Sequence, residues 1–142
     1  MQVKSSVGYT GVLQALDKKT KQIAAAKSKV LHKIGQEQVM VVQDRIRSSK
    51  TGPDGKPWAP WSMSTLKQRM RQGNASRGLL YRTGALLTSI KYKVEDAVLT
   101  IFTDVPYAKY LQFGTPKMPA RPFIGWGNQL NKILSQMKDA LK

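Results

Sequence analysis

From about Gly11 to Ser48 the chain contains no proline, and apolar side chains recur along it at helical intervals. The spacing approximates the three-four repeat of an amphipathic helix, which predicts one long N-terminal helix or two helices in tandem. Thr20, Lys27 and Glu37 interrupt the apolar stripe, and this argues against a strict coiled-coil seam. The apolar positions of the stripe are Leu13, Leu16, Ile23, Val30, Ile34 and Val41.

A straight helix of this length would span roughly 55 Å at about 1.5 Å per residue, which exceeds what a domain of 142 residues can cover. We therefore expect one of two arrangements. Either the helix breaks near Thr20 or Gly35, or one of its ends projects from the body and packs on a neighbouring subunit.

Up to Pro60, the segment after this helix is punctuated by proline and glycine, which indicates a loop. Trp58 and Trp61 flank Pro60. We interpret both as side chains that pin the loop to the core, and the alternative is a base-stacking role at a nucleic-acid site. A short basic helix follows, with Ser62 or Ser64 placed to cap it.

Alternating and β-branched residues in the second half predict a hairpin of Lys91–Glu95 and Ala97–Thr103 with its turn at Asp96. A short helix over Leu79–Ile90 precedes the hairpin, and an amphipathic helix from Trp126 to Leu141 closes the chain. Because a two-stranded sheet is marginally stable alone, we expect a further strand from elsewhere in the chain or from a neighbour.

These elements predict an α+β fold. It has a long N-terminal helix (or two in tandem), a small antiparallel β-sheet with helices packed on one face, and a C-terminal amphipathic helix. The length fits a single domain, with residues 1–49 as a helical arm and residues 50–142 as the α+β body. There are no cysteines, no apolar run approaches the roughly 18 residues of a membrane span, and the N-terminus lacks a signal-peptide core. We therefore expect a soluble, unexported protein.

The segment Val105–Gly125 places aromatic residues at helical spacing ahead of a glycine. Tyr107, Tyr110 and Phe113 fall within about two helical turns, and Gly114 stands where a helix C-terminus favours a left-handed residue. Three prolines then hold the exit extended. They are Pro116, Pro119 and Pro122. The segment carries no nucleophile, metal ligand set or acid pair, which favours an assembly surface over a catalytic site.

Three blocks follow one another along the chain: TGPDGKPWAPWSMSTLKQR, LLYRTGALLTSI and PYAKYLQFGTPKMPARPFIG. Their order and spacing resemble the virion morphogenesis, or tail completion, family of Mu-like tailed bacteriophages. The resemblance implies a non-enzymatic structural protein of the virion, located at the head–tail joint, or neck, and assembled in the cytoplasm of the bacterial host. It would act as a subunit of a homo-oligomeric ring with six-fold symmetry. The ring would link the head-side connector or stopper to the tail tube or terminator and surround the DNA passage.

By this resemblance, eight residues of the third block form the family motif, which we assign to the fold core and the intersubunit contact. They are Pro106, Tyr107, Tyr110, Phe113, Gly114, Arg121, Pro122 and Phe123.

The formal charge is +16, from 24 basic and 8 acidic side chains, and it indicates a polyanionic neighbour. A basic surface that serves solubility alone is the alternative. Because the basic residues lie on predicted ordered elements, we expect a positive field on a folded surface that faces packaged DNA or acidic neighbouring rings. The candidates are Lys27, Lys29, Arg45, Arg47, Lys50, Lys67, Arg69, Arg71, Arg77 and Arg82.

No catalytic, metal or cofactor site is predicted. His32 lies among lysines with no serine or aspartate at short range to orient it, and the eight carboxylates are scattered, which disfavours a metal-dependent nuclease. No phosphate-binding glycine loop is present. The alternative function is a nucleic-acid-binding protein without sequence specificity. It accounts for the charge equally well but gives the aromatic-proline segment no purpose.

Overall fold

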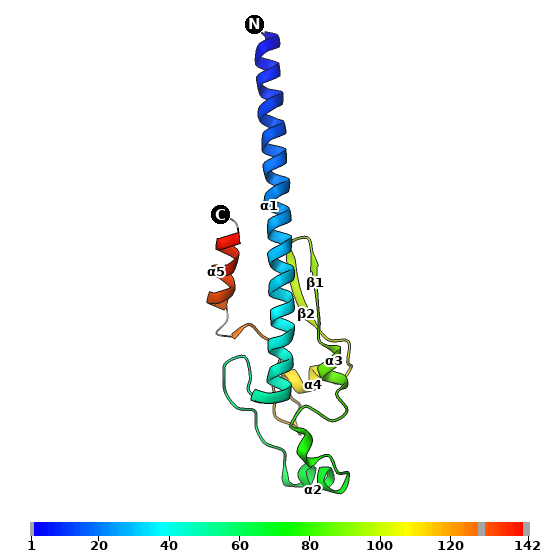
Figure 1. Cartoon of the computed structure of the whole chain (residues 1–142). Coiled ribbons are helices and arrows are strands. Elements are labelled where there is room, and N and C mark those ends of the chain that lie inside the picture. Colours follow the sequence, from blue (N-terminus) through cyan, green and yellow to red (C-terminus); the bar gives the residue numbers. More distant parts are fainter. Residues whose placement is uncertain (1, 128–129, 141–142) are drawn as a thin grey trace.

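The computed structural model describes the backbone of residues 2–127 and 130–140, and the side chains of residues 12–127 and 131–139. Helix α1, Gln2–Asp44, extends beyond all other elements at its N-terminal end (Figure 1). It passes through Thr20 and Gly35 without a break, so the projecting end is confirmed and the break is not found. The hydroxyl of Thr20 donates to the carbonyl oxygen of Leu16 at 2.8 Å, which satisfies this polar side chain within the helix.

We call residues 12–25 of α1 the arm, because all of their side chains are exposed. Burial of α1 begins with Leu31 and continues through Ile34 and Val42. The arm therefore adds no side chain to the core of its own chain.

Gly35 is the point of closest approach between α1 and the hairpin. A Cβ atom added at this glycine would lie 2.7 Å from Cγ of Tyr92, closer than real side chains approach. Gly35 thus lets the Tyr92 ring lie directly on the helix backbone.

Strands β1, Lys91–Glu95, and β2, Val98–Phe102, form an antiparallel pair in which Lys91 faces Phe102. The turn residues Asp96 and Ala97 have φ values of 49° and 61°, as a type I′ turn requires, so the predicted hairpin is confirmed. Within the described residues the sheet has these two strands alone, and α1 contacts both.

Helix α5, Leu130–Ala140, also packs on α1, and Figure 1 shows it on the side opposite the hairpin. Ile133 is buried in this contact and Met137 is partly buried, while Leu134 is about half exposed. The predicted C-terminal helix is therefore confirmed, although Trp126, its predicted first residue, lies outside it. The predicted contacts of Leu130 and Leu141 lie outside the described side chains.

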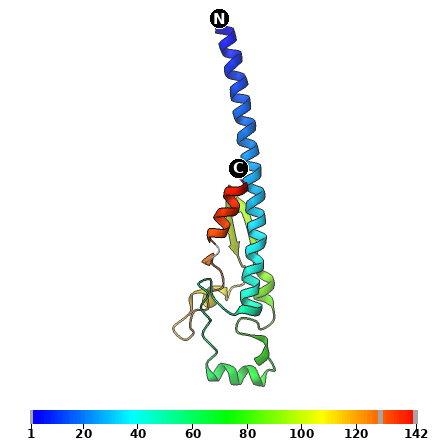
Figure 2. The same ribbon diagram turned by 60° about the vertical axis from the view of Figure 1, so that its left-hand side comes forward.

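At its other end α1 continues into a π-helical turn, η1, Arg45–Ser49, which ends at Lys50 in the left-handed conformation. The loop that follows is pinned by Trp58, which is buried, and by Trp61, which is half-buried. Helix α2, Met63–Arg71, begins at its predicted cap, where Ser62 Oγ accepts the backbone N–H of Thr65. Figure 2 shows α2 at the end of the molecule away from the arm.

After η2, Ala75–Arg77, the helix expected over Leu79–Ile90 is shorter than predicted. Helix α3 covers only Ala85–Ser89. Gly84, with a φ of 86°, breaks the helical path ahead of it. The expected apolar face is nevertheless buried: Leu80, Leu86, Leu87 and Ile90 all lie in the core.

Helix α4, Ala108–Phe113, ends at Gly114, whose φ of 76° confirms the predicted positive value. Its ψ of 177° differs from that of a left-handed helical residue and belongs to a region open mainly to glycine. The extended exit predicted for the prolines is wrong over its first part. Thr115 and Met118 exchange backbone hydrogen bonds of 2.9 and 3.1 Å in a tight turn, which Pro116 enters with its preset φ.

The core lies where the lower part of α1 meets α3, α4 and the segment after α4. Its largest fully buried side chains are Phe123, Ile34, Ile46, Leu86 and Val42. Phe123, from the predicted family motif, is therefore a central core residue.

Candidate functional site

Residues 121–125, called the strap below, cross the core as extended chain outside the described sheet. The side chain of Gln112 on α4 supplies three of the strap's hydrogen bonds. Its Oε1 accepts the backbone N–H groups of Phe123 at 3.0 Å and Ile124 at 3.1 Å, and its Nε2 donates to the carbonyl oxygen of Ile124 at 2.9 Å. The side-chain amide of Gln112 thus pairs with backbone groups of the strap that a neighbouring strand would otherwise pair with.

Two more side chains donate hydrogen bonds to the strap. Nη1 of Arg45 donates to the carbonyl oxygens of Phe123 at 3.0 Å and Gly125 at 2.8 Å, and Nε1 of Trp58 donates to that of Pro122 at 2.8 Å. Arg45 is buried, and burial lowers the pKa of its guanidinium, which stays charged because arginine starts far above neutral pH. The prediction that Arg45 faces DNA or a partner is therefore wrong.

Arg121 joins the strap to the tryptophan loop. Its Nε donates to the carbonyl oxygen of Ala59 at 2.8 Å and its Nη2 to that of Pro60 at 2.9 Å. Its backbone N–H bonds the carbonyl oxygen of Leu111 at 2.7 Å. Burial lowers the pKa of this guanidinium as well. Arg121 therefore stabilises the fold of its own chain.

The eight motif residues divide between the interior and the surface. Arg121 and Phe123 are buried, and Gly114 and Pro122 are partly buried. The exposed members all come from α4 and the turn before it. They are Pro106, Tyr107, Tyr110 and Phe113, and Phe113 is 80% exposed.

Two of the exposed motif residues, Pro106 and Phe113, line an open apolar groove of about 450 Å³ between β2, α4 and the strap. We call it the α4 groove. Tyr107 and Tyr110 are not among its lining residues. Its apolar lining is Phe102, Val105, Pro106, Ala108, Phe113, Phe123 and Ile124. A groove of this composition offers shape and apolar contact to a side chain from another molecule.

Most of the predicted basic residues gather at the α2 end of the molecule (Figure 1). Lys50 reaches this group, because a Cβ atom added at Gly78 would lie 3.4 Å from its Cε. The others near α2 and η2 are Lys67, Arg69, Arg71, Arg77 and Arg82. Arg47 is exposed on η1, while Lys27 and Lys29 lie apart on α1.

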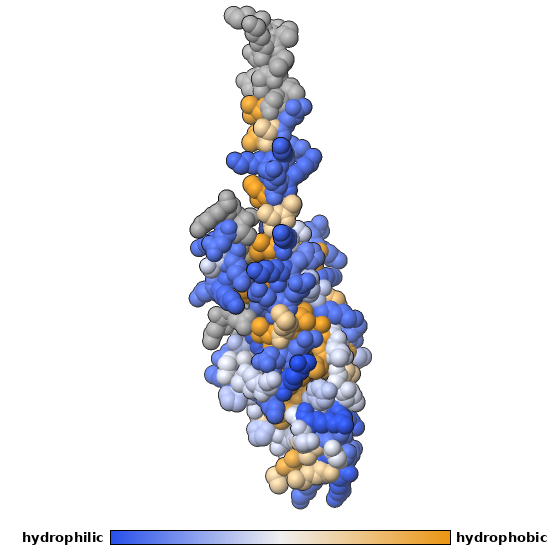
Figure 3. Space-filling view, in the orientation of Figure 1, coloured by the Kyte–Doolittle hydropathy of each residue, from blue (hydrophilic) through white to orange (hydrophobic). Residues whose placement is uncertain are grey.

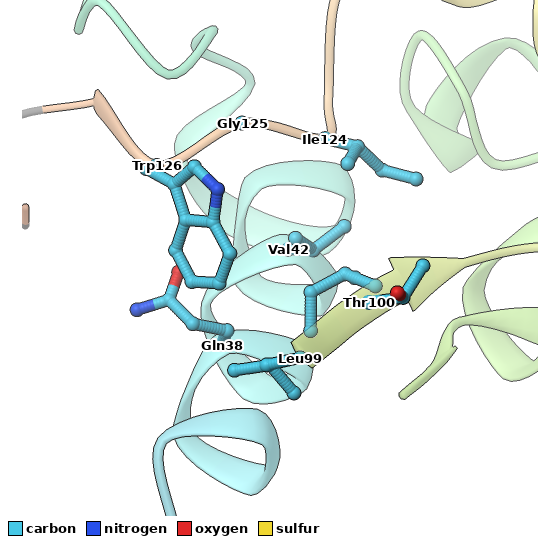
Figure 4. Close-up of a pocket in the computed structure, with 8 residues that line it drawn as sticks. Gln38, Val42, Leu99, Thr100, Ile124, Gly125 and Trp126 are labelled. Carbon is cyan, nitrogen blue, oxygen red and sulfur yellow. The ribbon is translucent and has the colours of Figure 1, made fainter. Parts of the chain in front are cut away.

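The described residues hold no group of three or more histidine, aspartate or glutamate side chains able to bind a metal ion. His32 is exposed and packs edge-on against Tyr92, with its Nδ1 3.3 Å from the tyrosine hydroxyl. A cavity of about 230 Å³ between α1, β2 and Trp126 is lined by apolar side chains, the amide of Gln38, the hydroxyl of Thr100 and the indole of Trp126 (Figure 4).

Two residues that organise this site carry no distinctive sequence signal. Gln112 stands among the aromatic residues of α4, and Arg45 is one of many basic residues. Their partners on the strap lie 11 to 80 positions away in the chain. Within the described residues no helix has both the length and the apolar character that a membrane crossing needs.

Comparison with known proteins addresses the resemblance directly. A profile of the phage virion morphogenesis family matches residues 7–142. An uncharacterised protein of Methanocaldococcus jannaschii is 36% identical over 104 residues, which is 69% of this chain and 76% of that protein. No solved structure matches the chain significantly. The chain therefore belongs to the phage virion morphogenesis family, and its role lies in building a phage particle.

Proposed function

We propose that this chain is a head–tail joint, or tail completion, subunit of a tailed phage virion and that its copies assemble into a closed ring. One observation carries the proposal. The chain exposes two apolar surfaces at separate places, the arm and the α4 groove with its aromatic border. Figure 3 shows apolar side chains along the arm, set among hydrophilic ones. We assign no catalytic role.

The two surfaces together have the area of one protein interface. On the arm, the exposed fractions are Val12 57%, Leu13 65%, Leu16 58% and Ile23 51%. At the α4 groove, Phe113 is 80% exposed and Pro106 is exposed as well. The arm residues offer on the order of 400 Å² of apolar surface, so a contact that covers them and a matching area of the groove would bury about 800 Å². A standard interface buries about 1,600 Å² in total, a little over half of it apolar.

The arm of one subunit is therefore proposed to lie in the α4 groove of the next. Such a contact joins two different surfaces, and it closes into a ring when the rotation between subunits divides a full turn. Six-fold symmetry follows from the family resemblance alone. The neighbours of the ring would be the head-side connector or stopper and the tail tube or terminator.

The exposed basic residues near α2 and η2 would give the proposed ring a positively charged surface. Repeated around a ring, the exposed cations of this end would create a strong positive field. They suit packaged DNA in the central passage or the acidic surface of an adjoining ring. The same cluster favours the second candidate, a monomeric or dimeric nucleic-acid-binding protein without sequence specificity.

Light scattering of the purified protein at low salt and at 1 M NaCl separates the two candidates. At 1 M salt the Debye length is about 3 Å, so apolar contacts persist while ionic ones weaken. We expect a closed oligomer at both salt concentrations, and Leu16→Glu to reduce it to monomers. Met63→Glu is the control, because Met63 is 68% exposed, against 58% for Leu16, but lies on α2.

A wild-type monomer at both salt concentrations would contradict ring formation by this chain alone. Duplex DNA binding that weakens with a log-log slope near 0.9 per phosphate contact would then favour the second candidate.

A further inference from the structure

A third cavity, of about 430 Å³, lies between α2, the segment before α3, and α4. Its polar lining consists of Arg69, Arg82, Thr83 and Tyr107. Its apolar wall is formed by Leu79, Leu80 and Leu111. We call it the two-arginine pocket. No acidic residue is among the residues that line it, so two positive charges share it without a counter-charge.

Arg69 is held in place with part of its hydrogen-bonding capacity unused. Its guanidinium lies over the ring of Trp61, with Cζ 4.7 Å from the ring centroid. Nη1 is buried and has no hydrogen-bond partner in the part of the chain that the structure describes. A buried guanidinium N–H without an acceptor is costly, and an acceptor from outside would remove that cost.

Arg82 adds a second positive charge at the same pocket, which favours binding of an anion there. Burial, and then the positive charge of Arg82, lowers the pKa of Arg69. A hydrogen bond helps to fix the loop that carries Arg82: Nη1 of Arg77 donates to the carbonyl oxygen of Arg82 at 3.0 Å. The two guanidinium groups are thus placed at one pocket although they repel each other.

We propose that the two-arginine pocket binds a carboxylate carried by an apolar segment of a different, acidic protein. Arg69 and Arg82 bind the carboxylate, and the leucine wall receives the apolar side chain beside it. A planar guanidinium matches a carboxylate with paired hydrogen bonds, which are stronger than hydrogen bonds between neutral groups.

Two features favour a protein carboxylate over a DNA phosphate. The pocket is a concave site with an apolar wall, whereas duplex DNA presents its phosphates on a convex, strongly hydrated surface. The chain itself has 8 acidic and 24 basic side chains, so a copy of it is a poor source of the anion. Charge complementarity therefore points to an acidic partner.

The pocket belongs to a single protomer, so the inference goes beyond the proposed ring and does not depend on it. The probe is 4-phenylbutyrate, which joins a carboxylate to an apolar group, and its uncharged amide is the matched control compound. Binding is followed by tryptophan fluorescence, since Trp61 contacts Arg69, and by the melting temperature, all at constant ionic strength. A dissociation constant on the order of millimolar is expected for a ligand of this size.

The variant Arg82→Gln changes an exposed side chain and should weaken 4-phenylbutyrate binding about tenfold or more. Arg71→Gln, an exposed arginine on α2 outside the pocket lining, should leave binding unchanged. The amide should not bind measurably. Circular dichroism of both variants confirms that each is folded.

Three results would overturn the proposal. The first is no binding of 4-phenylbutyrate at tens of millimolar. The second is binding of the amide as tight as that of the carboxylate. The third is that inorganic phosphate binds more tightly than 4-phenylbutyrate and that Arg82→Gln weakens duplex DNA binding more than Arg71→Gln does. Together these two results would show that the pocket is a DNA-binding site.

Discussion

Nη1 of Arg45 lies 3.0 Å from the carbonyl oxygen of Phe123 and donates a hydrogen bond to it. The bond joins the end of the longest helix to the most deeply buried aromatic residue of the family motif. The same nitrogen also bonds the carbonyl oxygen of Gly125. Through Arg45 the position of the strap, and with it one wall of the α4 groove, depends on α1.

Arg45→Met should lower the free energy of unfolding by about 2–4 kcal/mol. The substitution keeps an apolar stem of similar length but leaves two strap carbonyls without their charged donor. Urea denaturation measures the loss. Arg47→Met is the matched control, because Arg47 is exposed two positions away, and its effect should stay within about 0.5 kcal/mol. Equal effects of the two substitutions would contradict the structural role of Arg45.

Gly114→Ala should cost about 2–3 kcal/mol of stability. An added Cβ would lie 2.7 Å from the backbone nitrogen of Ala120, and the φ of 76° is itself unfavourable for alanine. Gly55→Ala is the control, since Gly55 has a φ of 78° with no atom within 4 Å of an added Cβ. It should show the backbone cost alone, about 1 kcal/mol. Thermal melts measure both losses. If both variants melt at the wild-type temperature, neither the backbone strain nor the close contact at Gly114 is present.

Gly35→Ala should destabilise the protein although alanine favours helices by about 1 kcal/mol over glycine. The added methyl group would meet the ring of Tyr92, and overpacking costs about 1–3 kcal/mol. In the background Tyr92→Ala the same change should become neutral or stabilising. A double-mutant cycle by urea denaturation tests this coupling, and additive effects would show that the ring does not press on Gly35.

Protonation of Asp104 in acid should slightly lower the free energy of unfolding, because it breaks the ion pair with Lys91. The hydrogen bond from Nζ of Lys91 at 3.2 Å lowers the pKa of its carboxyl, so the folded chain holds the proton less tightly than the unfolded chain. The contribution is complete above the unfolded value, about pH 4, and is lost as the pH falls through the lower folded value. Melts between pH 2 and 6 should show a weaker acid dependence for Asp104→Asn. Because the pair is exposed, the difference should shrink in 1 M salt, and a difference that persists there would contradict the assignment.

Local patterns in the sequence predicted the elements whose causes are local. The hairpin follows from alternation around Asp96, and α2 follows from its cap at Ser62. The continuity of α1 was left open, because the sequence alone does not say which surface meets Gly35. In the structure α1 continues through Gly35, and the Tyr92 ring packs there on the helix backbone.

The site was predicted in part, for the same physical reason. The motif identified the buried Phe123 and the exposed Phe113, but the spacing of its aromatic residues could not show which side chain faces inward. The prolines predicted the extended path of the strap. Its hydrogen bonds to Gln112, Arg45 and Trp58 were not predicted, since these partners lie as far as 80 positions away. The burial of Arg45 depends on those same distant carbonyls, so composition alone placed it with the surface cations.

Disulfide crosslinking between the arm and the α4 groove tests the central proposal most directly, because the chain has no cysteine of its own. The double variant Leu16→Cys, Phe113→Cys, oxidised and run on a non-reducing gel, should give a ladder of covalent multimers that stops at one closed size. Each single variant should remain monomeric. A double variant that stays monomeric, or Leu16→Cys alone forming dimers as efficiently as the double variant crosslinks, would contradict a ring built from the arm and the groove.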